Sequence, residues 1–127
     1  MKKICLCGGG SLGHVIAGWL SSKGKAEVSI LTGSPDRWNK EINVFLPESE
    51  VLTGHLTSVS GNPEEVISDA DVVLFCYPGF MIASELERIK PYLKQDAYVG
   101  SVFSSTGFFF GENLQYFFVC YYRIHSV

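Results

Sequence analysis

The residues best suited to chemistry lie near the N-terminus, where Gly8-Gly9-Gly10-Ser11-Leu12-Gly13 has the spacing G-x-G-x-x-G. In a strand-to-helix turn, Gly8 would allow the tight turn, Gly10 would let a diphosphate approach the backbone, and Gly13 would let helix and strand pack closely. The unpaired amides and positive dipole of the helix N-terminus would hold that diphosphate. A glycine-rich turn that binds nothing could show the same spacing, so the flanking segments must decide.

The flanking segments place the glycines where a dinucleotide site needs them. Residues 3–7 form a short apolar run typical of a buried strand, and residues 28–32 form a second strand rich in β-branched residues. Between them a helix is expected to end near Lys23-Gly24 and to pack Ala17 on the sheet. Its apolar face has amphipathic spacing and consists of Leu12, Val15, Ile16, Trp19 and Leu20. This βαβ unit of about thirty residues favours dinucleotide binding.

The end of the second strand bears on the choice between NAD and NADP. An acidic residue about 20 positions after the motif would accept hydrogen bonds from the ribose hydroxyls of NAD, whereas an arginine accommodates the 2′-phosphate of NADP. Leu31 and Thr32 stand at that position, followed by Ser34 and Arg37, with Lys40 nearby. The pattern favours NADP. Two alternatives stay open: Arg37 is a solvated surface charge, or Asp36 turns inward and supplies the acid.

The remaining residues predict further alternation of strands and helices. The expected elements are a short helix from Ser34 or Asp36 through Trp38 and Ile42, one or two short strands around Gly54 within residues 44–60, a helix starting at 62–65, a buried strand at 71–76, a helix with the face Ile82, Leu86, Ile89 and Leu93 that Pro91 ends, and a strand at 98–103. The fold class expected is therefore α/β, a Rossmann-type doubly wound parallel sheet with helices on both faces.

Composition excludes several other classes of protein. The chain has 127 residues, 46% hydrophobic and 18% charged, which fits one compact domain rather than a disordered chain. Its net charge of −3 argues against nucleic-acid binding. The four cysteines fit neither a disulfide framework nor a zinc site, so free thiols and a cytoplasmic location are expected. Glycines and His14 interrupt the N-terminal apolar stretch, so no signal peptide is expected, and no stretch reaches the ~18 apolar residues of a membrane span.

Rival nucleotide motifs fail on spacing. The segment from Gly18 to Lys25 is one residue too long between its glycines for a P-loop and continues with Ala26. None of the six tyrosines has a lysine four residues on, which argues against a short-chain dehydrogenase. A methyltransferase using S-adenosylmethionine would generally need an acid at the end of the second strand, where none stands.

Four segments together resemble the N-terminal domain of the octopine/nopaline (opine) dehydrogenase family. They are the glycine turn, residues 31–38 with the pattern T-x-x-P-x-x-W, residues 69–74, and Ser104-Ser105-Thr106-Gly107. The resemblance covers residues 2 to about 111 and extends, more distantly, to ketopantoate reductase and glycerol-3-phosphate dehydrogenase. Such enzymes use a nicotinamide cofactor to condense an amino acid reductively with a 2-oxo acid, or to reduce a related ketone.

The resemblance implies a role for each matching position. Gly8, Gly10, Ser11, Leu12 and Gly13 would hold the diphosphate, and Thr32, Ser34 and Arg37 would meet the adenosine ribose. Cys76, Tyr77 and Pro78 would lie at the ligand-binding edge of the sheet, and Ser104, Ser105 and Thr106 would border the nicotinamide. From the residues alone, Cys76 also reads as a core residue and His14 as a surface or packed one.

Two departures limit what the resemblance implies. Gly33 and Ser34 stand where the family usually has a basic residue, which leaves NADP or NAD open. The family's helical substrate domain, with its catalytic histidine, has no counterpart here. The expected organisation is a dinucleotide-binding domain at residues 1–111 and an aromatic segment at 112–127 that adds a last strand or ends a fragment.

The residues and the resemblance leave two alternative functions, one catalytic and one not. The chain is either the cofactor domain of an NAD(P)-dependent oxidoreductase acting on a small-molecule substrate, or an NAD(P)-binding or sensing module without catalysis. If the chain ends at Val127, cofactor binding without turnover is expected. The apolar Phe108-Phe109-Phe110 and the last strand predict association, with a second copy or with the missing domain.

Overall fold

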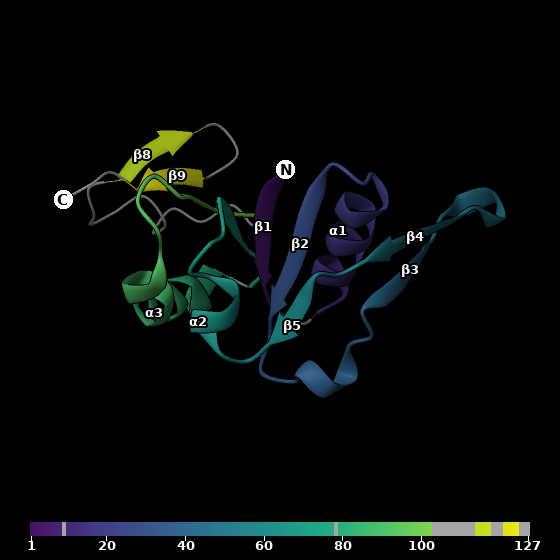
Figure 1. Cartoon of the computed structure of the whole chain (residues 1–127), viewed down its shortest axis with the longest axis horizontal. Coiled ribbons are helices and arrows are strands. Elements are labelled where there is room, and N and C mark those ends of the chain that lie inside the picture. Colours follow the sequence, from purple (N-terminus) through teal and green to yellow (C-terminus); the bar gives the residue numbers. More distant parts are fainter. Residues whose placement is uncertain (9, 78, 103–113, 118–120, 125–127) are drawn as a thin grey trace.

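The computed structural model describes residues 1–8, 10–77, 79–102, 114–117 and 121–124. Five parallel strands form the centre of the sheet, in the order β5 (Ser58–Ser60), β2 (Ala26–Leu31), β1 (Lys2–Cys7), β6 (Val72–Phe75) and β7 (Tyr98–Ser101) (Figure 1). The strand order reverses at β1, which lies between β2 and β6. This arrangement confirms the doubly wound parallel sheet predicted from the sequence.

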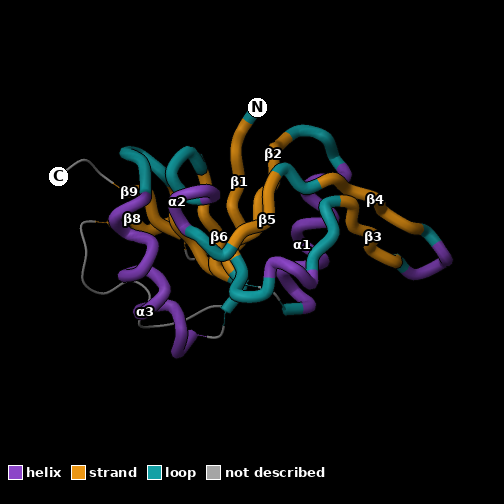
Figure 2. Tube along the Cα trace, turned by 60° about the horizontal axis from the view of Figure 1, so that its bottom comes forward, coloured by secondary structure: helices purple, strands orange, loops and turns teal. Residues whose placement is uncertain are grey.

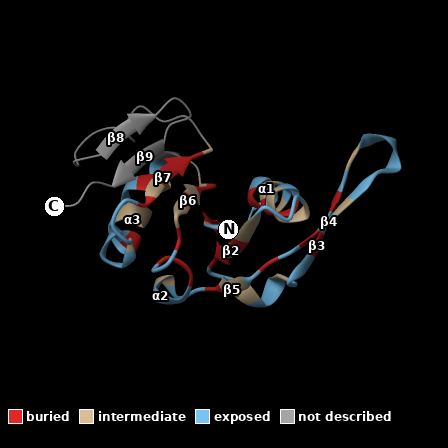
Figure 3. Cartoon of the chain, turned by 45° about the horizontal axis from the view of Figure 1, so that its top comes forward, coloured by how far each residue is buried: buried red, intermediate tan, exposed pale blue. Residues whose placement is uncertain are grey.

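Helices cover both faces of this sheet. Helix α1 (Ser11–Ser22) lies on one face, and α2 (Pro63–Val66) and α3 (Gly79–Ile89) lie on the other. The alternation of side chains along β1 serves the two layers, because Leu6 packs with Ala17 of α1, whereas Cys5 and Cys7 pack with Val66 and Ile82 from α2 and α3. Buried residues are therefore concentrated in the central strands and on the helix surfaces that face them (Figure 3).

The connection from β2 to β5 differs from the prediction. A short 3₁₀ helix at Pro35–Arg37 is followed by an antiparallel hairpin, β3 (Glu41–Phe45) with β4 (Val51–His55), and a 3₁₀ turn at Pro47–Ser49 joins the two strands. The strand expected around Gly54 is confirmed, but the helix expected to reach Ile42 is wrong. Ile42 lies in β3 because its side chain is buried in the core on the α1 side of the sheet.

The hairpin packs against α1, at the end of the molecule away from α3 (Figure 2). Two glycines make that contact close. A Cβ on Gly54 would overlap the side chain of Ser21 and lie 3.1 Å from the carbonyl oxygen of Gly18, and a Cβ on Gly18 would overlap Val44. The hairpin therefore approaches the helix backbone more closely than any larger residue at these positions would allow.

The other sequence-based expectations are mostly confirmed. The Asn62 side chain caps α2 by accepting a hydrogen bond of 3.1 Å from the Glu64 amide, and α3 ends at Ile89, before a 3₁₀ turn at Lys90–Tyr92 that contains Pro91. The expected strand at 98–103 is described only to Ser101, and Phe103 lies outside the described residues. No helix in the described part of the chain is long and apolar enough to cross a membrane.

The aromatic C-terminal segment forms two strands where one was predicted. Strand β9 (Tyr121–Ile124) pairs antiparallel with β7, and β8 (Leu114–Phe117) pairs antiparallel with β9, so the sheet has seven strands in all. Residues 112–127 were expected to add one last strand or to end a fragment; within them, the described residues 114–117 and 121–124 form these two strands. Phe108-Phe109-Phe110, on which the predicted association depends, lies outside the described residues.

Asp71, just before β6, contacts Lys3 at the start of β1 and Lys94 in the segment before β7. Its carboxylate accepts a hydrogen bond of 2.8 Å from the backbone amide of Lys3, its own amide donates to the Lys3 carbonyl at 2.7 Å, and Lys94 forms an ion pair with it. The Lys94 hydrogen bond, together with the Lys3 amide, lowers the pKa of Asp71. Its ionised form therefore stabilises the fold.

We predict that Asp71→Asn lowers the free energy of unfolding by about 1 kcal/mol at pH 7, the scale of one charge-assisted hydrogen bond. A lowered pKa contributes stability above the unfolded value of about 3.9, and that stability is lost as the pH falls through the lower folded pKa. Urea titrations at pH 7 and pH 2 should show a larger difference between wild type and variant at pH 7 than at pH 2. Asp69→Asn, which removes only an exposed pair with Lys3, is the control. Equal losses for both variants would contradict the role given to Asp71.

Candidate functional site

The turn between β1 and α1 depends on a glycine at position 8. Gly8 has a φ of +125°, and its amide donates a 2.9 Å hydrogen bond to the Leu31 carbonyl at the end of β2. A Cβ on Gly8 would lie 3.3 Å from the carbonyl oxygen of Cys76 and 3.4 Å from the ring of Tyr77. Both the backbone conformation and the available space therefore require glycine here.

The other two glycines of the motif differ in their surroundings. A Cβ on Gly13 would lie 3.3 Å from the Gly8 carbonyl oxygen and 3.6 Å from Cβ of Cys76, so the first turn of α1 packs directly on the glycine turn and the end of β6. Gly10, the N-cap of α1, has no atom within 4 Å of the place a Cβ would take. The turn is therefore packed at Gly8 and Gly13 and open at Gly10, where the amides of the helix N-terminus begin.

Backbone hydrogen bonds between neighbouring chain segments continue just beyond the ends of the strands. They hold several of the predicted site residues at one edge of the sheet. The Cys76 amide donates to the Cys7 carbonyl at 2.8 Å, and the Thr32 amide donates to the Ser60 carbonyl at 3.0 Å. The turn at Gly8, Thr32 after β2 and Cys76 after β6 thus share the carboxyl edge of the sheet. This is the edge at which open α/β sheets bind ligands, beside the point where strand order reverses.

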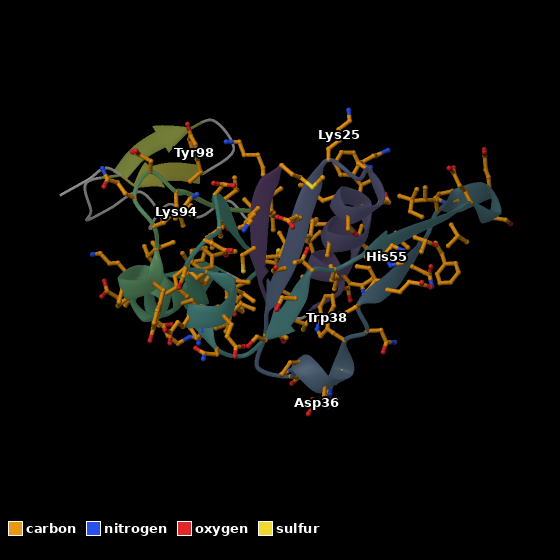
Figure 4. The ribbon with its side chains drawn as sticks, in the orientation of Figure 1. Lys25, Asp36, Trp38, His55, Lys94 and Tyr98 are labelled. Carbon is orange, nitrogen blue, oxygen red and sulfur yellow. The ribbon has the colours of Figure 1, made fainter. Side chains whose placement is uncertain are left out.

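The residues after β2 divide into buried and exposed positions. Thr32 is 5% exposed, and its hydroxyl oxygen accepts a 3.2 Å hydrogen bond from the Ser34 amide. Ser34 and Arg37 are exposed, and Arg37 lines a cleft that also reaches Gly10. Asp36 is not among the residues that line this cleft, and Figure 4 shows its side chain pointing away from the rest of the molecule. Arg37, rather than Asp36, therefore faces the candidate site.

The cleft has a volume of about 540 Å³ and lies between the first turns of α1, the 3₁₀ helix and β3. Volumes of this size are typical of small-molecule sites. Gly10, Ser11 and Arg37 were predicted as site residues, and the structure brings them together. The lining residues that the sequence analysis did not assign to the site are His14, Trp38, Asn39, Glu41, Ile42, Asn43 and Phe45. The alternation of polar and apolar residues along β3 could have identified several of them. The start of this segment was instead predicted to be helical.

Two of the predicted site residues, which follow β6, pack against the glycine turn. Cys76 is 8% exposed, and burial raises the pKa of its thiol to about 11. Burial, followed by the negative charge of Glu85, raises the pKa of Tyr77 to about 12. Both groups are therefore neutral at physiological pH, and they enclose the glycine turn as packing groups. Cys5 and Cys7 are likewise buried free thiols.

The remaining predicted residues are not all described. Leu12 is 39% exposed in the first turn of α1. Pro78, Ser104, Ser105 and Thr106 lie outside the described residues, so their predicted roles stay predictions. His14, which the sequence analysis left as a surface or packed residue, hydrogen-bonds to β3 and lines the cleft.

Comparisons with known proteins agree with this geometry. The sequence profile described as "Ketopantoate reductase PanE/ApbA" matches residues 4–103. The chain is 31% identical over 120 residues to an octopine dehydrogenase of Pecten maximus and 32% identical over 123 residues to a tauropine dehydrogenase of Arabella iricolor, matches that include 85% and 87% of this chain. A solved structure of octopine dehydrogenase in complex with NADH and agmatine superposes with a TM-score of 0.77 at 27% identity over 84% of this chain. The chain spans about 30% of the length of these relatives.

We predict unequal effects of alanine at Gly8 and at Gly10 on stability. Gly8→Ala should lower the free energy of unfolding by about 2–3 kcal/mol, because it combines an unfavourable φ with contacts to the Cys76 backbone. Gly10→Ala should change it by less than about 1 kcal/mol, because that position has an ordinary φ of −84° and open space around it. Thermal and urea unfolding of the two variants beside the wild type measure this. Equal losses at the two positions would show that the turn is not packed as described.

Proposed function

Because this chain belongs to the ketopantoate reductase PanE/ApbA family, we propose that it is the NAD(P)-binding domain of an oxidoreductase. The relatives named above are dehydrogenases, and the solved structure named above contains NADH. The proposed reaction is transfer of a hydride from the nicotinamide cofactor to an imine or a 2-oxo acid. The cofactor supplies the hydride, and this chain binds and orients it.

The open position at Gly10 carries this proposal. A diphosphate needs close access to the backbone amides at the start of α1, and Gly10 leaves that space free while Gly8 and Gly13 are packed against their neighbours. Ser11 is exposed beside it. The residues present therefore fit the diphosphate of a dinucleotide. The proposed diphosphate-binding residues are those of the sequence motif, Gly8, Gly10, Ser11, Leu12 and Gly13.

The other proposed contacts follow the carboxyl edge of the sheet. Thr32, Ser34 and Arg37 would meet the adenosine ribose, and Cys76 and Tyr77 would enclose the turn. The proposal keeps Pro78 at that edge and Ser104, Ser105 and Thr106 beside the nicotinamide. It also keeps residues 1–111 as the dinucleotide-binding domain.

The substrate class and setting are proposed from the relatives. Solved structures of octopine dehydrogenase contain agmatine, L-arginine or pyruvate together with NADH. We propose an amino compound and a 2-oxo acid as the corresponding class for this protein, and the cytoplasm as its location. We further propose association of this chain with a substrate-binding domain or with a second copy.

Binding of the cofactor tests the proposal directly. Calorimetric titration of the wild type with NADH and with NADPH should show saturable binding of at least one. Gly10→Ala should weaken that binding at least tenfold without loss of fold, because a methyl group occupies the space needed by the diphosphate. Ser84→Ala, at an exposed position of α3 on the other face of the sheet, is the control outside the proposed site. Absence of binding to the wild type would refute the proposed function.

Arg37 predicts a preference for the phosphorylated cofactor. Arg37 lines the cleft, whereas Asp36 does not, so we expect NADPH to bind about tenfold more tightly than NADH, as one charge-assisted contact would give. Arg37→Gln should remove that preference and leave NADH binding unchanged. Lys25→Gln changes the net charge equally at the opposite edge of the sheet and should preserve the preference (Figure 4). Tighter binding of NADH than NADPH by the wild type would rule the preference out.

A further inference from the structure

Helix α1 has an outward face that the described part of the chain leaves about half exposed. Leu12, Val15 and Trp19 follow one another along this face and are 39%, 46% and 51% exposed. The other sides of the helix are occupied, because Ala17 is buried in the core and Gly18 lies against the hairpin. A helix face that meets only water is usually polar, and an exposed apolar patch marks an interaction site. Leu12, Val15 and Trp19 form what we call the α1 stripe.

The end of the α1 stripe is positively charged. The Lys23 ammonium lies 5.3 Å from the centroid of the Trp19 ring, close enough for a cation–π contact. Lys25 follows in the turn after the helix, and both lysines are exposed. Neither forms an ion pair with another residue of the described ranges. The stripe therefore joins an apolar surface to two positive charges that no carboxylate balances.

The end of the β3–β4 hairpin has the opposite charge. Phe45 and Val51 face each other across the two strands and are 79% and 46% exposed. The turn between them carries Glu48 and Glu50, which are exposed and have no ion pair among the described residues. Figure 1 shows this turn projecting beyond α1, at the end of the molecule away from β8 and β9. Phe45, Glu48, Glu50 and Val51 form the hairpin tip.

The hairpin tip and the α1 stripe belong to one chain but do not meet within it. The hairpin is held on a neighbouring side of α1, where a Cβ on Gly54 would lie 3.1 Å from the Gly18 carbonyl oxygen, and its turn points away from the helix (Figure 1). Both surfaces are therefore open to a second copy. Apolar residues would meet apolar residues, and the two glutamates of the tip complement the two lysines beside the stripe.

We propose that two copies of this chain associate through the hairpin tip of each and the α1 stripe of the other. A twofold arrangement makes this contact twice, because each copy contributes one tip and one stripe. The doubling matters, since the largest apolar patch of a typical monomer covers about 300–600 Å², whereas a stable interface buries about 800 Å² per partner. The association proposed above is thereby committed to a second copy, and it does not depend on cofactor binding.

Removing the indole of the stripe tests its apolar part. Sedimentation equilibrium of the full chain over a concentration series should show a dimer for the wild type and at least tenfold weaker dimerisation for Trp19→Ser. Phe80→Ser, which removes an aromatic ring that is 85% exposed at the start of α3, is the matched control and should dimerise like the wild type. A wild type that stays monomeric at every concentration overturns the inference, as does weakening by Phe80→Ser alone.

Exchanging charges tests which surfaces meet. The helix variant Lys23→Glu with Lys25→Glu and the tip variant Glu48→Lys with Glu50→Lys should each dimerise about tenfold more weakly than the wild type. Their equimolar mixture should form a heterodimer within about threefold of wild-type affinity, because opposite charges again face each other. The tip variant brings the net charge of −3 closer to zero, so a non-specific charge effect would strengthen its association instead. Phe45 is left unchanged because it also lines the cleft.

The outcomes separate this inference from the proposed function. If the helix variant dimerises weakly and the tip variant like the wild type, the stripes of two copies contact each other and the proposed contact is wrong. Trp19 does not line the cleft, so calorimetric binding of NADH or NADPH should be the same in Trp19→Ser and in the wild type. Absence of cofactor binding with dimerisation intact refutes the proposed function alone. Should Trp19→Ser not fold, the charge variants decide.

Discussion

The close approach of the glycine turn to the ends of β2 and β6 is the constraint on which the candidate site depends. Gly8 and Gly13 each leave about 3.3 Å between a would-be Cβ and a backbone carbonyl oxygen, so any side chain there would push the start of α1 away from the sheet. Because α1 also supports the hairpin through Gly18, such a shift would move the wall of the cleft as well. One packing requirement thus positions both the helix amides and the cleft.

The site relies on backbone dipoles more than on ionised side chains. The Cys76 thiol and the Tyr77 hydroxyl, with pKa values raised to about 11 and 12, remain neutral at physiological pH beside the turn. The positive charge of Arg37 lies at the outer end, on an exposed 3₁₀ helix. Helix amides provide a fixed positive potential that does not depend on pH. A cofactor bound in this way carries the reactive chemistry itself, and the protein supplies position and electrostatic complementarity.

The sequence predicted the parts of the fold whose pattern has one physical interpretation. The apolar run at 71–76 and the glycine turn followed by helical spacing each have a single good solution in an α/β sheet, and both were located correctly. Residues 34–46 admit two solutions, because Trp38 and Ile42 are four apart, as in a helix, while Ile42 and Val44 alternate, as in a strand. Contact with α1 selects the strand, and that contact is not visible in local spacing. The cleft residues of β3 were missed for the same reason.

The glycine motif and the hairpin between β2 and β5 position different parts of the candidate site. Parallel strands need a long crossover connection, which is usually a helix. Here residues 32–57 make the crossover, and a hairpin packed on α1 takes the helix's place. A helix in this connection would bury one stripe on the sheet and turn its other side to solvent, whereas the hairpin buries Ile42 and Val44 and presents Asn43 and Phe45 along one wall. The glycine motif accordingly specifies where a diphosphate would lie, and the crossover specifies what surrounds the rest of the ligand.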